Sequence, residues 1–355
     1  MPDHTEQRLQ QAVQEAHRNT QPLNIIGGGS KAFYGREATG MPLHTAAHRG
    51  VVRYDPAELV LSARAGTTVA EVEALLGKEN QMLGFEPPRF GRETATLGGM
   101  VAAGLAGPRR PYAGAVRDFV LGVKILNGKG EIMRFGGEVM KNVAGFDLAR
   151  LMAGAMGALG VVLEISLRII PQPPVEKTLV LEHPQHAAAI ALFNRLAARP
   201  LPLSAAAWHA GETRLRLSGG AEGVKRAAEA VGGEEDVAGG QFWQRLRDHE
   251  LPFFQDQREL LRVSAPPAAE LGALDAPQLV DWGGAQRWLV GGADGEAVRA
   301  LVARHGGHVT RFRHGDRRSA IFQPLAAPLH ALHLRLKRAF DPAGILNPGR
   351  LYRDW

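Results

Sequence analysis

The sequence reads Ile25-Ile26-Gly27-Gly28-Gly29-Ser30-Lys31 near its beginning and Thr94-Ala95-Thr96-Leu97-Gly98-Gly99 further along. Glycine has no Cβ, so its backbone N–H groups can approach phosphate oxygens in conformations that other residues resist. Two such loops on an α/β background predict a clamp around a pyrophosphate. A lone glycine triplet is often only a surface turn, and the second loop is what favours a ligand site.

The first loop also matches the dinucleotide-binding pattern G-x-G-x-x-A, with Gly27, Gly29 and Ala32. In a Rossmann domain this loop opens a long helix, and an acidic residue follows roughly twenty residues later to bind the ribose. Here the chain reaches Pro42 without a helical apolar period, and no acid stands at the expected ribose position. A Rossmann domain is therefore not predicted.

The composition limits the classes of protein to consider. A chain of 355 residues exceeds a comfortable single core, so two domains are expected. The 42 Lys and Arg against 36 Asp and Glu give a weak, dispersed excess of +6, which does not favour nucleic-acid binding. The absence of cysteine excludes disulfides and any iron–sulfur cluster held by this chain. With no leader-like start and no long apolar run, a cytoplasmic location is expected, at most peripheral to the inner face of the cytoplasmic membrane.

The periodicity of the apolar residues predicts two units. Thr68 and Glu71 form a capping box that opens a helix, and alternating apolar residues over 163–169 predict a strand. The stiff segment Pro171-Gln172-Pro173-Pro174 then marks a domain boundary. We predict a first domain over 1–173, a second over 174–335, and a C-terminal segment over 336–355 that returns to the first.

The second unit contains an internal sequence similarity, which we call the sequence echo. Residues 208–221 resemble residues 281–293, and each stretch precedes a helical pattern that ends at a glycine pair. Two hairpin-plus-helix halves predict one antiparallel sheet covered by helices, although chance similarity between Gly/Ala-rich segments is the alternative. The segment 239–258 separates the halves. Its Trp243, Phe253 and Phe254 are read either as a lid or contact surface, or as buried aromatics.

Several further motifs follow the second loop in a fixed order. They are Tyr112-Ala113-Gly114 with Asp118, the strand Val120 to Leu126, the turn Asn127 to Gly130, Lys141 to Leu148, Gly157 to Val162, and the tail Phe340 to Arg350. This series resembles the FAD-binding domain of the vanillyl-alcohol-oxidase type (PCMH-type). The overall length, the wording of residues 27–34 and the short cap resemble most closely the FAD-binding E subunits of bacterial glycolate oxidases (glycolate dehydrogenases). The resemblance implies an α+β fold, with a two-subdomain PCMH-type FAD-binding domain and a smaller α+β cap domain that contains an antiparallel sheet.

The same resemblance implies which residues hold the cofactor. The residues expected on the pyrophosphate are Gly27, Gly28, Gly29, Ser30, Thr94, Thr96, Gly98 and Gly99, and those expected on the other flank of the FAD are Gly160 and Val162. Family members that attach flavin covalently use a histidine in the first loop, or a cysteine or histidine elsewhere. This chain has Ser30 and Lys31 in the loop and no cysteine, so noncovalent FAD is predicted.

The catalytic residues stay unknown at this stage. Oxidation of a 2-hydroxyacid needs a cation for the carboxylate and a base for the hydroxyl proton. Related catalytic flavoproteins carry H-x-G-D-G-N in the cap, whereas residues 313–318 share only His-Gly-Asp. Arg110 and His314 are the candidates, with a solvated loop and an exposed turn as the alternative readings. His330 and His333 lie one helical turn apart without a third ligand, so no metal site is predicted.

Three functional hypotheses follow. The leading one is an FAD-binding subunit of a heteromeric glycolate oxidase, which converts glycolate to glyoxylate together with a second FAD-containing subunit and an electron-accepting iron–sulfur subunit. The second is a stand-alone FAD-dependent dehydrogenase for glycolate or D-lactate, and the third is a structural subunit with a vestigial flavin pocket. Purification of the lone chain distinguishes the three. A yellow chain that is inert with glycolate supports the first hypothesis, a yellow and active chain supports the second, and a colourless chain supports the third.

Overall fold

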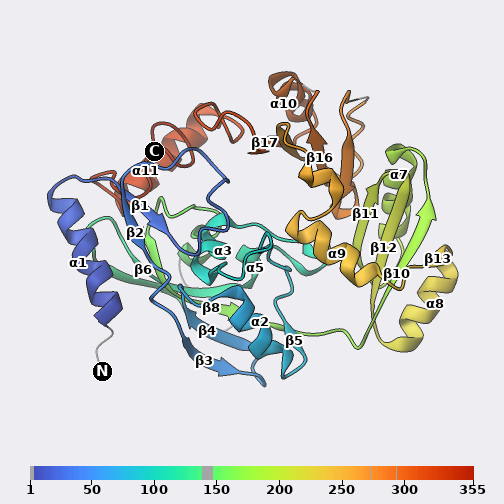
Figure 1. Ribbon diagram of the computed structural model, residues 1–355, viewed down its shortest axis with the longest axis horizontal. Helices are drawn as coiled ribbons and strands as arrows, with labels where there is room; N and C mark the ends of the chain where they lie inside the picture. Colours follow the sequence, from blue (N-terminus) through green and yellow to red (C-terminus); the bar gives the residue numbers. More distant parts are fainter. Residues whose placement is uncertain (1–3, 138–146, 273, 293) are drawn as a thin grey trace.

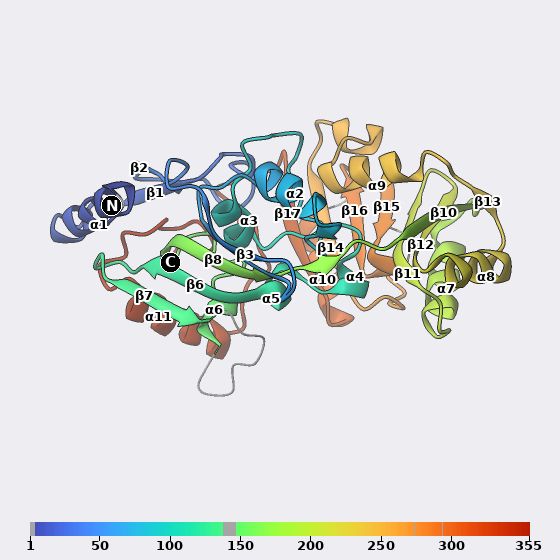
Figure 2. The ribbon, with the colours of Figure 1, turned by 90° about the horizontal axis from the view of Figure 1, so that it is seen from below.

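The computed structural model describes residues 4–137, 147–272, 274–292 and 294–355. Most of the Lys141 to Leu148 motif therefore lies outside the described residues. The described residues of 4–171 and 327–355 lie at one end of the molecule and form the first domain, and those of 175–313 lie at the other end and form the cap domain (Figures 1 and 2). Its mixture of helices with mainly antiparallel sheets confirms the predicted α+β fold.

The first domain combines a small parallel pair of strands with a larger antiparallel sheet. β1 and β2 are parallel, and the five-stranded sheet has the order β3-β4-β8-β6-β7. The elements are α1 (His4–Arg18), β1 (Leu23–Ile26), β2 (Met41–His44), β3 (Val51–Asp55), β4 (Val60–Arg64), α2 (Val69–Gly77), β5 (Gln81–Met82), α3 (Leu97–Ala103), α4 (Arg110–Ala113), α5 (Val116–Phe119), β6 (Val120–Leu126), β7 (Ile132–Gly136), α6 (Leu148–Leu151), β8 (Val161–Arg168) and β9 (Ile170–Pro171).

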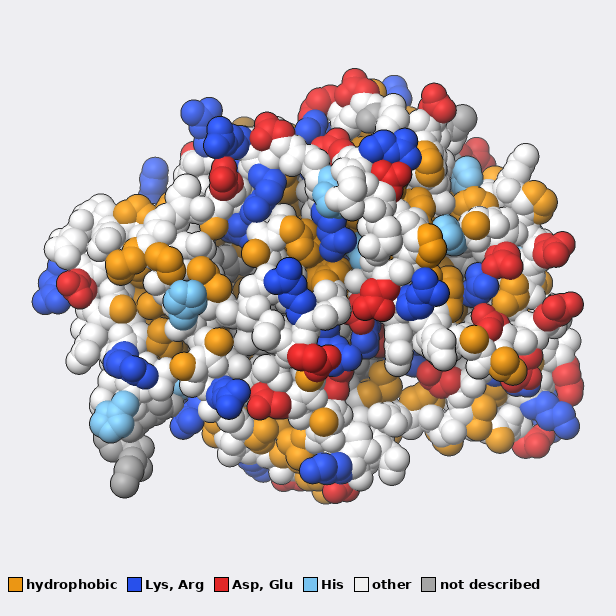
Figure 3. Space-filling view, in the orientation of Figure 1, with side chains coloured by type: hydrophobic (Ala, Val, Ile, Leu, Met, Phe, Trp, Pro, Cys, Tyr) orange, Lys and Arg blue, Asp and Glu red, His pale blue; other side chains and the backbone are white. Residues whose placement is uncertain are grey.

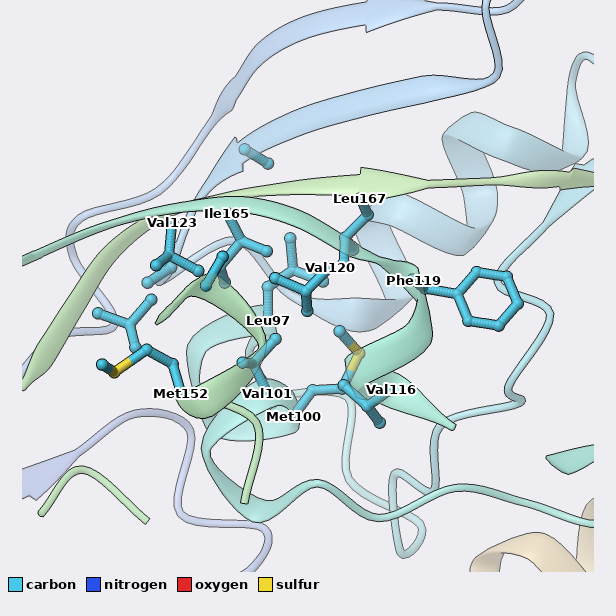
Figure 4. Packing of buried hydrophobic residues seen from close by; sticks show 14 of the residues in the cluster. Leu97, Met100, Val101, Val116, Phe119, Val120, Val123, Met152, Ile165 and Leu167 are labelled. Carbon is cyan, nitrogen blue, oxygen red and sulfur yellow. The ribbon is translucent and has the colours of Figure 1, made fainter. Parts of the chain in front are cut away.

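The core of this domain fixes the position of the second glycine loop. Leu97, Met100 and Val101 of α3 are buried against Val123 and other apolar residues of β6 and β8 (Figure 4). The helix begins directly after the loop, because the Thr96 side chain accepts a hydrogen bond from the Gly99 backbone. Burial of one face of α3 therefore determines where residues 94–99 lie.

The cap contains one eight-stranded sheet, in the order β13-β10-β12-β11-β15-β16-β14-β17. Its elements are β10 (Val175–Glu182), α7 (His186–Ala197), β11 (Leu203–His209), β12 (Glu212–Gly219), α8 (Ala221–Val231), β13 (Glu234–Glu235), α9 (Gly239–Asp248), η1 (Pro252–Gln255), β14 (Leu260–Ser264), β15 (Gln278–Asp281), η2 (Trp282–Gly284), β16 (Gln286–Val290), α10 (Gly295–Arg304) and β17 (His308–Arg313). Hairpin β11–β12 precedes α8 and hairpin β15–β16 precedes α10, so the sequence echo corresponds to two halves joined where β11 pairs with β15.

The segment 239–258 belongs to the core of the cap. Trp243 and Phe254 are each only 3% exposed, and the indole of Trp243 donates a hydrogen bond to Thr178 Oγ1 at 2.9 Å. These two aromatics are thus packed inside the protein, and the reading as a lid or contact surface does not describe them.

The chain returns to the first domain through α11 (Ala327–Phe340). This helix runs across position 336, where the sequence places the last boundary, because its apolar contacts with the first domain continue to Phe340. Lys337 and Asp341 then form a buried ion pair of 2.7 Å. Lys337 Nζ also donates to the carbonyls of Ala158 and Leu346, so the tail is joined tightly to the first domain.

Candidate functional site

A cavity of about 320 Å³ lies between the first glycine loop, α3 and the C-terminal tail. Its wall is formed by residues from four parts of the chain. They are 24–32, 37–38, the group Thr96, Gly99, Ala102 and Ala103 with Met156, and Arg317 with Asn347 and Arg350. The cavity therefore has the position that the two-loop prediction requires.

The two loops are in direct contact. Thr94 Oγ1 donates a hydrogen bond of 3.0 Å to the Gly28 carbonyl. A Cβ on Gly28 would overlap the Thr94 carbonyl oxygen, and a Cβ on Gly27 would overlap Thr96 Oγ1. Glycine at 27 and 28 thus permits the two loops to approach each other, in addition to leaving backbone groups open to a ligand.

The first loop presents unpaired backbone donors to the cavity. Within the described ranges, the N–H groups of Gly28, Gly29, Ser30 and Lys31 make no hydrogen bond. Gly29 has φ 72°, and a Cβ there would meet nothing within 4 Å. Successive N–H groups in such a turn form a concave donor surface for an anion, and buried donors without a partner are costly. This arrangement fits the pyrophosphate of FAD.

Six of the ten predicted cofactor residues line the cavity: Gly27, Gly28, Gly29, Ser30, Thr96 and Gly99. The other four do not. Thr94 supports Gly28 from behind, and Gly98 lies against Ala65, to whose carbonyl its N–H already donates at 2.8 Å. Gly160 packs on Ile125, and Val162 is buried in the core. The assignment of these four residues to the cofactor stays a prediction.

The C-terminal tail supplies cavity residues that sequence reasoning missed. Arg350 donates hydrogen bonds to the carbonyls of Tyr34 at 2.6 Å and Arg36 at 2.7 Å, and burial lowers its pKa to about 10. Asn347 accepts a hydrogen bond from the Ile25 backbone at 2.7 Å. The tail motif marks these residues in the sequence, but only the fold brings them to the first loop.

Lys31 is a buried cation at the edge of the cavity. Its side chain is 9% exposed, and its Nζ donates to Ser30 Oγ at 3.2 Å. Burial lowers the pKa of Lys31 to about 8, although Asp248 opposes this effect. No carboxylate lies within 4.0 Å of the amine in the part of the chain that the structure describes. A bound phosphate would provide the missing counter-charge.

We expect FAD binding to weaken as the pH rises through about 8, because Lys31 then loses its charge in the free protein. Bound phosphate favours the charged amine, so binding takes up a proton and the affinity is highest below this pKa. Flavin-fluorescence titration should show about tenfold weaker binding at pH 9 than at pH 7.

Variants test the assignment to Lys31. Lys31→Arg should remove the pH dependence, and Lys31→Met should bind weakly at both values. Lys78→Met, at an exposed position, is the control. Unchanged pH dependence in Lys31→Met would show that another group is responsible.

Neither catalytic candidate lies on the cavity wall. The Arg110 guanidinium lies 4.4 Å from the centroid of the Trp282 ring, at the junction of the two domains. His314 follows β17 with φ 62° and is exposed. Within the described residues, the structure shows no contact between Arg110 and His314. Arg317, three residues after His314, does reach the cavity, and it donates to the carbonyls of Gly35 and Arg36. His330 contacts Asp354 at 2.9 Å, and the described residues contain no group of three metal-ligating side chains.

Comparison with known proteins gives a consistent set of relatives. The family described as FAD binding domain matches residues 3–136, and FAD linked oxidases, C-terminal domain, matches residues 295–351. Glycolate oxidase subunit GlcE of Escherichia coli (strain K12) is 48% identical over 98% of this chain and 97% of its own length. D-lactate dehydrogenase of Archaeoglobus fulgidus is 27% identical over 73% of this chain and 54% of its own.

Solved structures support the fold. A crystal structure of p-cresol methylhydroxylase superposes with a TM-score of 0.75, covering 98% of this chain and 87% of that chain at 17% identity. A 4-ethylphenol oxidase from Gulosibacter chungangensis gives 0.72, over 99% and 88%, at 14% identity. Among the described residues, no helix combines the length and apolar character needed to cross a bilayer.

Proposed function

The chain belongs to the family of the glycolate oxidase subunit GlcE, and from this we propose that it is the FAD-carrying subunit of a glycolate-oxidising complex. The observation that carries the proposal is the row of unpaired backbone donors at residues 28–31, beside a cavity formed by both FAD-linked family regions. Bound FAD would supply the acceptor for a hydride from the hydroxyl-bearing carbon of a 2-hydroxyacid.

The residues of this chain would bind and orient that cofactor. Backbone groups of 28–31 would donate to the pyrophosphate, and Lys31 would add a positive charge beside it. Arg317 and Arg350 hold the end of the first loop through its carbonyls. Because Ser30 and Lys31 occupy the loop where covalent attachment would need histidine, we propose noncovalent FAD, and acid precipitation should release all flavin into the supernatant. Flavin absorbance that stayed with the precipitate would contradict this.

We further propose that partner proteins accept the electrons. A chain without cysteine cannot hold an iron–sulfur cluster, so reduced flavin must pass its electrons to another protein or an external acceptor. A second FAD-containing subunit and an iron–sulfur subunit fit this requirement, as a complex in the cytoplasm or peripheral to the inner face of the membrane. The similarity to the GlcD subunit of Bacillus subtilis, 31% identity over 43% of this chain and 32% of that protein, supports a related flavoprotein as the companion.

We expect the lone chain to be yellow, and glycolate to reduce its flavin at least about a hundredfold more slowly than in the complex. His314 is exposed and outside the cavity, so this region provides no positioned base for the hydroxyl proton, and general base catalysis contributes about 10²–10⁴-fold. Anaerobic stopped-flow spectroscopy of both forms measures the rates. Rapid bleaching of the lone chain would favour the stand-alone dehydrogenase.

Purification from the native cell tests the complex itself. A tagged full-length chain should co-elute with a second flavoprotein and an iron–sulfur protein in fixed ratio. A monomeric chain that supports full dye-linked glycolate oxidation without a companion would overturn the proposal, and a colourless chain would favour the vestigial pocket.

A further inference from the structure

Several cations at the junction between the two domains lack a carboxylate partner. In the parts of the chain described here, Arg110, Arg262 and Arg313 have no carboxylate oxygen within 4.0 Å, and each guanidinium instead lies over an aromatic ring. Nearby arginines are paired: Arg109 and Arg216 both contact Glu86. Lys and Arg side chains also gather along this junction on the face shown in Figure 3. The guanidinium groups of these three arginines therefore have positive charge available to bind an anion.

Arg262 is the member of this group that lines a cleft. It projects from β14, and its Nε donates to Gln286 Oε1 at 2.6 Å. The guanidinium carbon lies 5.0 Å from the Trp282 ring centroid and 5.9 Å from that of Trp288. Asp281 lines the same cleft, but burial raises its pKa to about 7, so near neutral pH its charge offsets that of Arg262 only in part. The guanidinium keeps N–H groups for a ligand.

Two neutral hydrogen-bonding groups accompany Arg262. The Tyr34 hydroxyl accepts a hydrogen bond from the Arg262 guanidinium from outside the walls of the cleft, and burial raises the tyrosine pKa against the effect of Arg262, so the hydroxyl stays protonated. His249 is 6% exposed and stacks on Phe254 with ring centroids 3.9 Å apart. Its Nδ1 is buried without a hydrogen-bond partner in the structure as described. Burial, with Arg313 and Arg262, holds the His249 pKa well below its ordinary value, so the ring is neutral.

The cleft is small and adjoins the cofactor cavity. Its free space is about 20 Å³, and its walls include Phe90, Leu105, Trp288 and Phe312. This volume admits a group the size of one or two waters. Lys31, which lines the FAD cavity, lies 5.7 Å from the centroid of the Phe90 ring. A group in the cleft is thus next to the place proposed for flavin.

We propose that this cleft binds the carboxylate group of a small organic acid, with Arg262 supplying the charge, His249 supplying a hydrogen-bonding group, and the Tyr34 hydroxyl orienting the Arg262 guanidinium. The inference rests on the proposed function in taking a small 2-hydroxyacid as the natural ligand. The aromatic walls lower the effective dielectric around the guanidinium, which strengthens an arginine–carboxylate contact relative to one at the surface. The small volume selects for the carboxylate itself, with the rest of the acid outside the cleft.

Titration of the FAD-loaded full-length chain tests the site without turnover. Acetate is the probe, glycolamide is the neutral comparison, and ionic strength is held constant. Tryptophan fluorescence reports on Trp282 and Trp288, and calorimetry gives the affinity independently. Acetate should bind saturably and glycolamide should not. Arg262→Gln should weaken acetate binding about ten- to hundredfold, and the exposed Arg304→Gln should leave it unchanged.

A second variant keeps the test informative if Arg262→Gln does not fold. Tyr34→Phe retains the ring packed 5.1 Å from Phe312 and removes only the hydroxyl, so acetate affinity should fall about two- to tenfold. Equal affinity of the wild type and both folded variants, or equal binding of glycolamide, would overturn the inference. Flavin content and co-purification are measured on the same samples. If both are normal while acetate fails to bind, this inference fails and the proposed function stands.

Discussion

Replacement of Gly28 by valine is expected to abolish FAD binding, with a loss of affinity of at least about a hundredfold. A Cβ at this position would overlap the Thr94 carbonyl oxygen, which belongs to the backbone and cannot rotate away. The first loop must therefore separate from the second, and the unpaired donors at 28–31 lose their common orientation. The flavin-to-protein ratio after gel filtration measures the effect.

A matched control separates this effect from general damage. Gly77 lies at the end of α2 in the same domain, and a Cβ there would meet nothing within 4 Å. Gly77→Val should keep its flavin, and circular dichroism should show that both variants retain the fold. Full flavin occupancy in Gly28→Val would show that the contact between the loops does not organise the cofactor site. Gly98→Val is expected to act differently, because its Cβ would lie 2.9 Å from the Ala65 Cβ and would displace α3.

Replacement of Asp341 by alanine should lower the free energy of unfolding by about 3–5 kcal/mol, the range found when one partner of a buried ion pair is removed. Asp341 and Lys337 are 1% and 4% exposed, so the lysine would remain buried without its counter-charge. The Asp341 carboxylate also accepts hydrogen bonds from the backbone of Ile345 and Leu346. Urea denaturation of the FAD-free chain measures the change.

The double variant Lys337→Met, Asp341→Ala tests the cause of this loss. If the unpaired charge is responsible, removal of both charges should recover part of the stability. Glu229→Ala, at an exposed position on α8, is the control and should change stability by less than about 0.5 kcal/mol. A loss below about 1 kcal/mol in the Asp341 variant would show that the tail is held mainly by its apolar contacts.

Local chemistry explains why much of the fold could be predicted from the sequence. The Thr68 capping box and the alternation over 163–169 depend on neighbouring residues, and the structure shows both in place. The glycine triplet likewise shows, from the sequence alone, that the backbone at residues 27–29 can adopt conformations that other residues resist. Position 98 shows the limit of this reasoning, because a glycine that admits Ala65 and a glycine that admits a phosphate look the same in a sequence.

The rest of the site depends on contacts between residues far apart in the chain, which the spacing of residues in the sequence does not reveal. Lys31 lies beside the Phe90 ring and within the electrostatic influence of Asp248 of the cap, and the hydrogen bond from Arg350 to Ala32 joins residues 318 positions apart. The fragment at 313–318 directed attention to His314, whereas Arg317 is the member that reaches the cavity. Arg262 and His249 carry no motif at all, and the packing of α9 and β14 within the cap brings them together.

The late position of Arg350 in the sequence affects when the cofactor site can form during protein synthesis. The first loop leaves the ribosome early, but the arginine that holds its end is made 318 residues after Ala32. At about 5–20 residues per second, that interval is roughly 15–60 s. The flavin cavity therefore cannot be completed until translation has passed Arg350, and any flavin bound before that point would lack the arginine that holds the end of the first loop.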